Sequence, residues 1–257
     1  MPVSLGHFRT KRPVQDLVAA ALVVVAALSV LPEAHGAWVT LGSSSGPDAG
    51  GYIQITPELQ NQVGAVWNDS PLDLTSDFDI WLLVNPGDRD ANGADGFSIV
   101  FQNDPLGLGA IGDSAGGGEW LGMHNIYPAL GIEIDTWQNG NRGDPACDHV
   151  GINEFITASS LPDHAGAAPV CAASDGANIE DGLDHSIRLV WDASAPLLTV
   201  YFDGQQVLTY NKNIADIFGG TTTAWFGVVG STGGSFNRQL FKAILPGSEL
   251  AVSKTVL

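Results

Sequence analysis

The chain has 257 residues, of which 44% are hydrophobic and 15% are charged. This composition supports a packed core and excludes an intrinsically disordered chain. The formal net charge of −18 excludes a surface that attracts nucleic acid or anionic lipid.

Residues 1–36 have the pattern of a secretory signal peptide. Arg9, Lys11 and Arg12 precede an apolar run over residues 17–31, and residues 34–36 resemble a small-x-small cleavage site. The run is shorter than the roughly 20 residues that a membrane-spanning helix needs. We therefore expect export to the medium or the cell surface, with no membrane insertion after cleavage. A retained membrane anchor is the alternative.

Residues 37–248 are predicted to form one all-β domain. Runs rich in β-branched and aromatic residues recur between Gly- and Asp-rich turns, with no amphipathic helix of useful length. The clearest runs are 78–84, 96–102, 130–137, 186–191, 197–202 and 224–230. Asp203-Gly204 predicts a hairpin turn, and the whole pattern is typical of a sandwich or barrel. Residues 249–257 are expected to be a terminal strand or the start of a further surface-protein repeat.

Two segments, 103–122 and 153–182, are predicted to be long loops, which are often functional in a compact β domain. Cys147 and Cys171 are the two cysteines. In an oxidising compartment one disulfide is expected. It would close a loop of about 25 residues and stabilise the fold by about 3 kcal/mol. Two free buried thiols are the alternative.

The segment 133–149 holds six potential metal ligands: Glu133, Asp135, Trp137, Asn139, Asp144 and His149. The first four are spaced by two, so an extended strand would place them on one face. Burying carboxylates is costly without compensation, which a bound cation would supply. Oxygen donors favour calcium, and carboxylates with an imidazole suit manganese, zinc or a similar ion. A polar turn between two strands is the alternative interpretation.

The same segment resembles the metal-binding strand of the legume (L-type, concanavalin A-like) lectins, here of a bacterial secreted type. That family carries Glu-x-Asp-Thr-aromatic-x-Asn, then Asp-Pro and His-x-Gly-Ile, and residues 133–152 follow this pattern. The resemblance implies a jelly-roll β-sandwich of two large antiparallel sheets. It implies Ca²⁺ held by Asp135, the Trp137 carbonyl, Asn139 and Asp144. It also implies Mn²⁺ or another transition metal held by Glu133, Asp135, Asp144 and His149.

The resemblance further implies a sugar site beside calcium. Ala94-Asp95-Gly96 is similar to the family's Ala-Asp motif, whose peptide is typically cis. Asp95 would accept hydrogen bonds from sugar hydroxyls, Asn139 would donate one, and Trp137 would offer an apolar face. A glycine-rich loop, residues 115–119, would donate a backbone N–H from Gly117 or Gly118. In the late loop 231–239 the candidates are Asn237, Arg238 and Gln239.

The predicted function is calcium-dependent carbohydrate binding by a secreted or cell-surface lectin domain, with glycans or glycoconjugates as partners and no enzyme activity. One alternative is a structural or adhesive surface domain with this fold and little sugar affinity. Another is a laminarinase-type glycoside hydrolase, because Glu133-Ile-Asp135 is similar to its catalytic strand. Its second carboxylate, about 5 Å from the first, would lie where Trp137 and Gln138 stand. Neither the sugar nor the oligomeric state is indicated.

Three further patterns are weaker. Residues 112–116 fit the G-x-S-x-G motif of serine hydrolases, but the strand–turn–helix context and oxyanion loop are missing. Residues 142–144 read Arg-Gly-Asp, although Asp144 is better explained as a metal ligand. His124, His164 and His185 have no convincing partners in the sequence and are expected in loops or at the surface.

Overall fold

The computed structural model describes Met1, residues 37–113 and residues 117–244. The chain divides into two units, Met1–Val30 and Leu31–Leu257. The expected signal peptide, apart from Met1, and the expected terminal segment 249–257 lie outside the described residues. In the described part, no helix is long and apolar enough to cross a bilayer.

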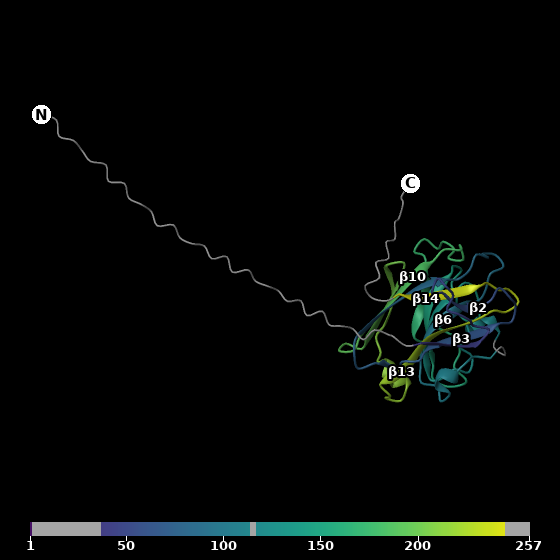
Figure 1. Cartoon of the computed structure of the whole chain (residues 1–257), viewed down its shortest axis with the longest axis horizontal. Helices are drawn as coiled ribbons and strands as arrows, with labels where there is room; N and C mark the ends of the chain where they lie inside the picture. The colour runs from purple at the N-terminus through teal and green to yellow at the C-terminus, as the bar shows by residue number, and fades with distance from the viewer. Residues whose placement is uncertain (2–36, 114–116, 245–257) are drawn as a thin grey trace. The chain divides into compact units, whose positions relative to one another are not determined.

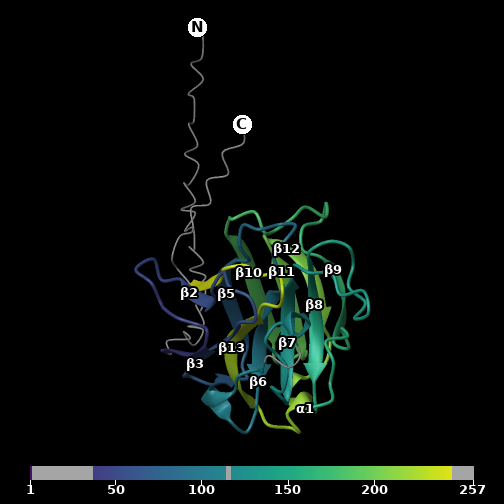
Figure 2. The same cartoon turned by 90° about the vertical axis from the view of Figure 1, so that its right-hand side faces the viewer.

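The described part of Leu31–Leu257 is built from two antiparallel sheets (Figure 1 and Figure 2). The larger sheet has the order β1 (Trp38–Gly42), β3 (Val63–Asn68), β13 (Thr223–Ser231), β6 (Gly96–Gln102), β7 (Ala129–Asp135), β8 (His149–Phe155) and β9 (Ala167–Cys171), and β4 (Leu72–Asp73) also pairs with β13. The smaller sheet has the order β12 (Gln205–Tyr210), β11 (Leu197–Phe202), β10 (His185–Asp192), β5 (Phe78–Asn85), β14 (Gln239–Ile244) and β2 (Ile53–Thr56).

Strand alternation decides which side chains enter the core between the two sheets. On β7, Leu130, Ile132 and Ile134 belong to the main apolar cluster, together with side chains of the smaller sheet. Glu133 and Asp135 alternate with them, so they point to the other face of the larger sheet. They are nevertheless buried, because loops cover that face.

A second apolar cluster holds these covering loops in place. Trp67, Trp120, Met123 and Phe155 pack together on the outer face of the larger sheet. The Trp67 indole N–H donates to the Ala110 carbonyl at 2.7 Å, which satisfies its polar group. The covering segment contains two short 3₁₀ turns, η1 (Gly107–Gly109) and η3 (Gly118–Trp120). Gly118 of η3 lies against Asp95, the residue that precedes β6.

The predicted all-β sandwich of two large antiparallel sheets is confirmed. The hairpin is confirmed as well, since β11 and β12 pair and both turn residues have positive φ, 45° at Asp203 and 76° at Gly204. Two predictions are wrong in detail. Strand β7 ends at Asp135, before Trp137, and the predicted loop 153–182 contains the end of β8 and all of β9. A short helix, α1 (Ile214–Ile217), was not predicted.

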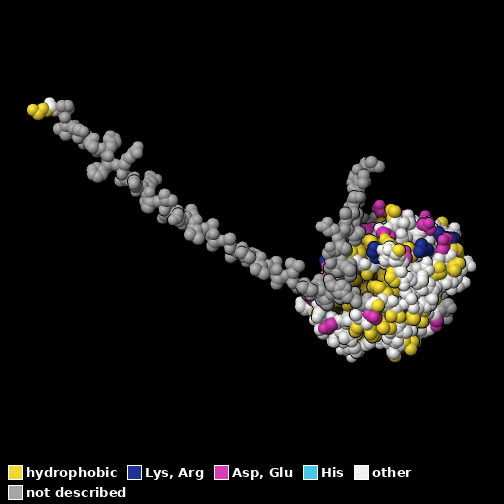
Figure 3. All heavy atoms as spheres, viewed as in Figure 1, with side chains coloured by type: hydrophobic (Ala, Val, Ile, Leu, Met, Phe, Trp, Pro, Cys, Tyr) yellow, Lys and Arg dark blue, Asp and Glu magenta, His cyan; other side chains and the backbone are white. Residues whose placement is uncertain are grey.

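The charge imbalance of the sequence is visible on the surface. The chain has 28 acidic and 10 basic residues, and on the face shown in Figure 3 acidic side chains outnumber the few basic ones. Such a surface repels polyanions.

Candidate metal centre and adjoining pocket

The centre of the candidate site is a buried group of carboxylates around one imidazole. Glu133 and Asp135 come from β7, and His149 lies directly opposite Asp135 on β8. The loop between the two strands brings back Asp144. His149 Nε2 lies 3.7 Å from Glu133 Oε1, 3.9 Å from Asp135 Oδ2 and 3.8 Å from Asp144 Oδ1. Donor atoms that share one ion at about 2.1 Å are themselves roughly 3 to 4 Å apart.

The buried negative charges of this group favour a bound cation. Burial raises the pKa of Asp135 well above its usual range, and the negative charge of Glu133 raises it further. Burial also lowers the pKa of His149, which favours the neutral imidazole. Its Nδ1 lies 3.3 Å from the Cys147 carbonyl oxygen, which can only accept, so the proton belongs on Nδ1. The lone pair of Nε2 then faces carboxylate oxygens, an arrangement that a bound cation makes favourable.

Two buried polar atoms support the same conclusion. Neither His149 Nε2 nor Asn139 Oδ1 has a hydrogen-bond partner in the described part of the chain. Buried polar groups without partners are rare in native proteins and often mark a missing ion. The backbone of the loop is already tied to the carboxylates, because the Asn139 N–H donates to Asp144 Oδ2 at 2.5 Å and the Trp137 N–H to Asp135 Oδ1 at 2.8 Å. The donor set fits both a calcium ion and a transition-metal ion.

His164 belongs to this group, contrary to the expectation that it has no partner. Its Nε2 lies 2.6 Å from Glu133 Oε1 and 3.6 Å from Asp144 Oδ1. Burial lowers the pKa of His164, but Glu133, Asp144 and Asp163 together raise it by more. Asn153 was also missed, although its spacing of two from Gly151 and His149 on β8 places it on the same face. No comparable spacing signals His164, which comes from the loop before β9.

The other two histidines also have partners. His185 Nδ1 lies 2.8 Å from Asp203 Oδ2, and His124 Nδ1 lies 2.5 Å from Asp113 Oδ1. The expectation that these two histidines have no partners is therefore wrong, although neither of them belongs to the carboxylate group.

A pocket of about 510 Å³ lies beside the carboxylate group. It is lined by Asn61, Asp95, Gly117, Gly118, Glu119, Trp137, Asn139, Gly233, Gly234 and Ser235. Five of the six predicted sugar-binding residues are therefore brought together. Trp137 and Asn139 belong to the loop that also carries Asp144, so the pocket and the carboxylate group share one loop. The indole of Trp137 contributes an apolar surface, and this residue is 39% exposed.

Asp95 is the buried acid of the pocket. The Ala94-Asp95 peptide is cis, as the resemblance implied. The pKa of Asp95 is raised to about 7, because the raising effects of burial and of the Glu119 charge outweigh the lowering effect of a hydrogen bond from the Gly233 backbone. Its Oδ2 has no hydrogen-bond partner among the described residues. The pocket thus presents an acceptor that a hydroxyl-bearing ligand can satisfy.

The wall of the pocket is fixed by an ion pair that the sequence did not indicate. Arg142 donates from Nη2 to Glu119 Oε1 at 2.7 Å and from Nε to Glu119 Oε2 at 3.1 Å. This two-point contact joins the glycine-rich loop to the loop that carries Asp144. Such bidentate pairs are stronger and better oriented than single contacts. Arg142 is therefore engaged within the fold, which argues against an Arg-Gly-Asp adhesion motif.

Asn237 is placed away from the pocket, and its predicted contact with sugar is corrected. It is 0% exposed, and its Nδ2 donates to the Arg89 carbonyl and to Glu180 Oε1. The late loop instead reaches the pocket with Gly233, Gly234 and Ser235. Gln239 is also buried, and Arg238 Nε donates to Gln54 Oε1 at 3.1 Å.

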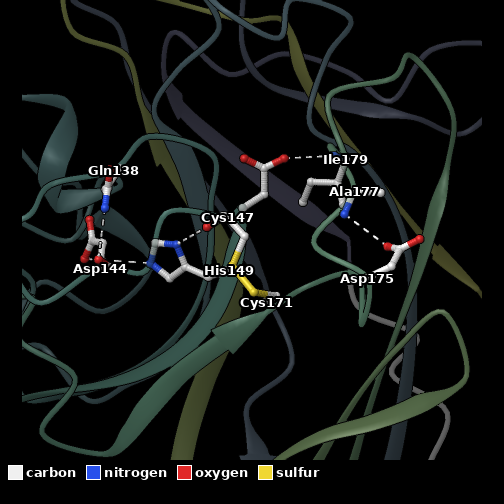
Figure 4. The surroundings of a disulfide bond; sticks show 9 residues. Gln138, Asp144, Cys147, His149, Cys171, Asp175, Ala177 and Ile179 are labelled. Carbon is white, nitrogen blue, oxygen red and sulfur yellow. Dashed lines mark hydrogen bonds and ion pairs between the residues drawn. A yellow bond between two sulfur atoms is a disulfide. The ribbon is translucent and has the colours of Figure 1, made fainter.

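The predicted disulfide between Cys147 and Cys171 is present (Figure 4). It ties the loop between Asp144 and His149 to the end of β9. The Asp148 carboxylate accepts the Ile179 N–H at 2.8 Å and fastens the next loop to the same place. The covalent bond thus restrains the segment that carries two of the candidate ligands.

The comparisons with known proteins agree with this architecture. Residues 33–244 match the model of the family described as the legume lectin beta-barrel domain. Lectin I-B4 from Griffonia simplicifolia, in a metal-free form, has a TM-score of 0.60 and 21% identity, covering 81% of this chain and 90% of that chain. The lectin from Bauhinia forficata, in complex with GalNAc, has a TM-score of 0.59 and 19% identity, with 80% and 90% covered. The Ca²⁺/Man₃GlcNAc-bound lumenal domain of VIP36 has a TM-score of 0.60 and 17% identity, with 80% and 84% covered.

Curated relatives are much longer than this chain. The serine-rich adhesin for platelets of Staphylococcus aureus strain MRSA252 is 24% identical over 226 residues, which is 78% of this chain and 16% of the adhesin. The protein of the same name in strain MSSA476 is matched over 9% of its length. The solved structures, all below 25% identity, support the fold, and the family model covers most of the chain. The chain therefore belongs to the legume (L-type) lectin family.

Proposed function

We propose that this chain is a calcium-dependent carbohydrate-binding domain. The observation that carries the proposal is the shared loop 136–144. It supplies Asp144 to the buried carboxylate group, and it supplies Trp137 and Asn139 to the pocket. Metal binding and ligand binding would therefore depend on one segment of backbone.

In this proposal Ca²⁺ is held by Asp135, the Trp137 carbonyl, Asn139 and Asp144. Mn²⁺ or another transition metal is held by Glu133, Asp135, Asp144 and His149. The ions neutralise the buried carboxylates, which are otherwise costly. Asn139 Oδ1, which has no partner among the described residues, would face calcium. Its amide N–H groups would then point in a fixed direction into the pocket.

The pocket would recognise a pattern of sugar hydroxyls. Asp95 would accept hydrogen bonds from two of them, Asn139 would donate one, and the backbone N–H of Gly117 or Gly118 would donate another. Trp137 would stack its apolar face on the ring. None of these residues lies in a β-strand, so recognition would be sensitive to loop geometry. The ligands named for the structural neighbours, GalNAc in one case and Man₃GlcNAc in another, support a glycan as the ligand class.

Binding without turnover is supported by the burial of the carboxylates that a hydrolase would use. Glu133 and Asp135 are 1% and 3% exposed, and neither lines the pocket. A glycoside hydrolase needs two carboxyl groups that reach the scissile bond. Here both are enclosed with His149, where they fit a cation better than a substrate.

We also propose that the protein is exported and acts at or outside the cell surface. Three features support this: the signal-peptide pattern of residues 1–36, the disulfide, and the adhesins among its relatives. A domain at the head of a longer surface protein would agree with the small share of those adhesins that the chain matches.

A glycan array, read in calcium and again in EDTA, tests the proposed function. We expect binding to a defined class of glycan in calcium and none in EDTA. Asp95→Ala should abolish binding, whereas Asp69→Ala, a change at an exposed aspartate outside the pocket, should not. Binding that persists in EDTA, or in Asp95→Ala, would contradict the proposal. A folded, metal-bound protein that binds no glycan would instead favour the adhesive domain with little sugar affinity.

A further inference from the structure

We propose that His164 is an additional ligand at the transition-metal position, so that this chain coordinates the metal with two imidazoles. This inference rests on the metal-binding part of the proposed function. The family resemblance implies a single histidine there, His149. The structure adds a second one from a loop that the metal-binding motif does not include.

The geometry places His164 among the donors. Single donor atoms of Glu133, His149 and His164 all lie within 4.8 Å of one another. The His164 imidazole is only 5% exposed, and its Nε2 is directed at Glu133 Oε1. The centroids of the two imidazole rings are 5.8 Å apart and the ring planes meet at 71°, so the rings are not stacked on each other. The His164 imidazole is therefore buried and positioned among the candidate metal ligands by the fold.

The surroundings hold His164 in this place. Asn153 Oδ1 accepts the His164 backbone N–H at 2.7 Å, while Asn153 Nδ2 donates to Glu133 Oε2. One side chain thus positions both the loop and the glutamate. His164 itself has φ of 59°, in the left-handed region that few non-glycine residues adopt. Hydrogen bonds of this kind to the groups around a ligand are how proteins orient metal-binding side chains.

Gly151 leaves the space that this arrangement needs. It lies opposite Glu133 on β8. A Cβ at this position would come within 2.1 Å of Glu133 Oε1 and 2.8 Å of His164 Cδ2. Any side chain larger than glycine would therefore separate His164 from the carboxylate group.

A second imidazole changes which ion the site prefers. With Glu133, Asp135 and Asp144 alone beside His149, the donors are mostly oxygen, which suits Mn²⁺. Two imidazole nitrogens favour Zn²⁺, Co²⁺, Ni²⁺ and Cu²⁺, which also bind more tightly than Mn²⁺ to almost any nitrogen-containing site. We therefore infer that the transition-metal position of this chain selects Zn²⁺ or a similar ion over Mn²⁺.

X-ray absorption at the zinc edge counts the imidazoles directly. The full chain, stripped of metal and reloaded with Ca²⁺ and one equivalent of Zn²⁺, should show two imidazoles in the wild type and one in His164→Gln. A wild-type spectrum with a single imidazole would overturn the proposal, and would leave His164 as an ion-pair partner of Glu133. The wild-type spectrum alone tests the proposal, so the test remains valid even if His164→Gln folds poorly.

Calorimetric titration of Zn²⁺ and Mn²⁺ in saturating Ca²⁺ gives the second test. His164→Gln should weaken Zn²⁺ binding by about 10- to 100-fold or more. Residues that only hydrogen-bond to a metal ligand already contribute about that much to affinity, and a direct ligand should contribute at least as much. It should weaken Mn²⁺ binding less. His124→Gln, a matched change at a histidine outside the group, should leave both affinities within about threefold. A Zn²⁺ affinity unchanged in His164→Gln would overturn the proposal.

The glycan array separates the two proposals. Two imidazoles in a protein that binds no glycan would support the ligand role of His164 and refute the proposed carbohydrate binding. One imidazole in a protein that binds glycan in a calcium-dependent way would refute only the ligand role of His164.

Discussion

Gly118 is the point where the glycine-rich loop comes closest to the Asp95 carboxylate. A Cβ built on Gly118 would lie 1.6 Å from Asp95 Oδ2 and 1.9 Å from its Cγ. Real Cβ contacts below 3.0 Å are essentially never found, so the two groups must separate by about 1.4 Å in Gly118→Ala. Because hydrogen bonds tolerate only a few tenths of an ångström, this shift would break the contacts of Asp95 with a bound sugar.

The expected loss of affinity follows from the charge of Asp95. A hydrogen bond to a charged group contributes about 1.5 to 3 kcal/mol. Losing two of them should weaken binding by at least about 3 kcal/mol, or roughly 100-fold. The free energy of unfolding should fall by about 1 to 3 kcal/mol, the usual cost of overpacking. The fold should survive, since Gly118 lies in the short 3₁₀ turn η3 and belongs to neither apolar cluster.

Calorimetric titration with the glycan found on the array measures the affinity, and urea unfolding measures the stability. Gly109→Ala is the matched control, because a Cβ there has no atom within 4 Å and its φ is not positive. It should leave glycan affinity unchanged. Gly118→Ala that folds and binds within about threefold of the wild type would refute the reasoning that the loop and Asp95 are closely fitted.

Three further predictions concern stability. Adding EDTA should lower the melting temperature, and calcium at about 100 times its Kd should restore about 2.7 kcal/mol; equal melting temperatures in EDTA and calcium would contradict a structural ion. Replacing Cys147 and Cys171 together by serine should lower the free energy of unfolding by about 3 kcal/mol, measured in urea, and a loss below about 0.5 kcal/mol would show that the cross-link adds little to stability. Burial lowers the pKa of His185, but Asp203 and Asp181 together raise it by more, so the net pKa lies above its ordinary value. The contribution of His185 to stability is therefore complete below about pH 6.5 and is lost as the pH rises through the pKa of the folded state. His185→Gln should cost up to about 1 kcal/mol at about pH 5.5 and less at about pH 9, and the opposite order in urea unfolding would refute this assignment.

Much of the site could be predicted because its residues follow strand alternation or short motifs. Glu133 and Asp135 are separated by two on a strand, and the structure places both on one face. Asp144 and His149 were placed with them by motif. The extension of the strand to Trp137 and Asn139 was wrong, because the chain turns after Asp135. Those two residues still reach the pocket, by loop geometry and not by alternation.

Apart from Asn153 on β8, the residues that the sequence did not reveal lie in loops or in a 3₁₀ turn. Arg142 and Glu119 form their ion pair across 23 positions of sequence, and no periodicity relates them. Asn237 was expected at the pocket because it lies in the late loop 231–239, which does reach the pocket through Gly233, Gly234 and Ser235. A side chain in a loop can point toward the pocket or into the protein interior. The hydrogen bond from Asn237 Nδ2 to Glu180 Oε1 holds the Asn237 side chain in the interior.

From the amino-acid sequence we could predict the fold class, the two strand carboxylates, the Ala94-Asp95 motif and the disulfide. The two carboxylates were predictable because side-chain direction on a strand is set locally, by backbone geometry that repeats every two residues. The contact of His164 with Glu133 and that of Gly118 with Asp95 are seen only in the folded chain. Those contacts depend on how loops distant in sequence pack against the outer face of the larger sheet, and local sequence does not encode that path.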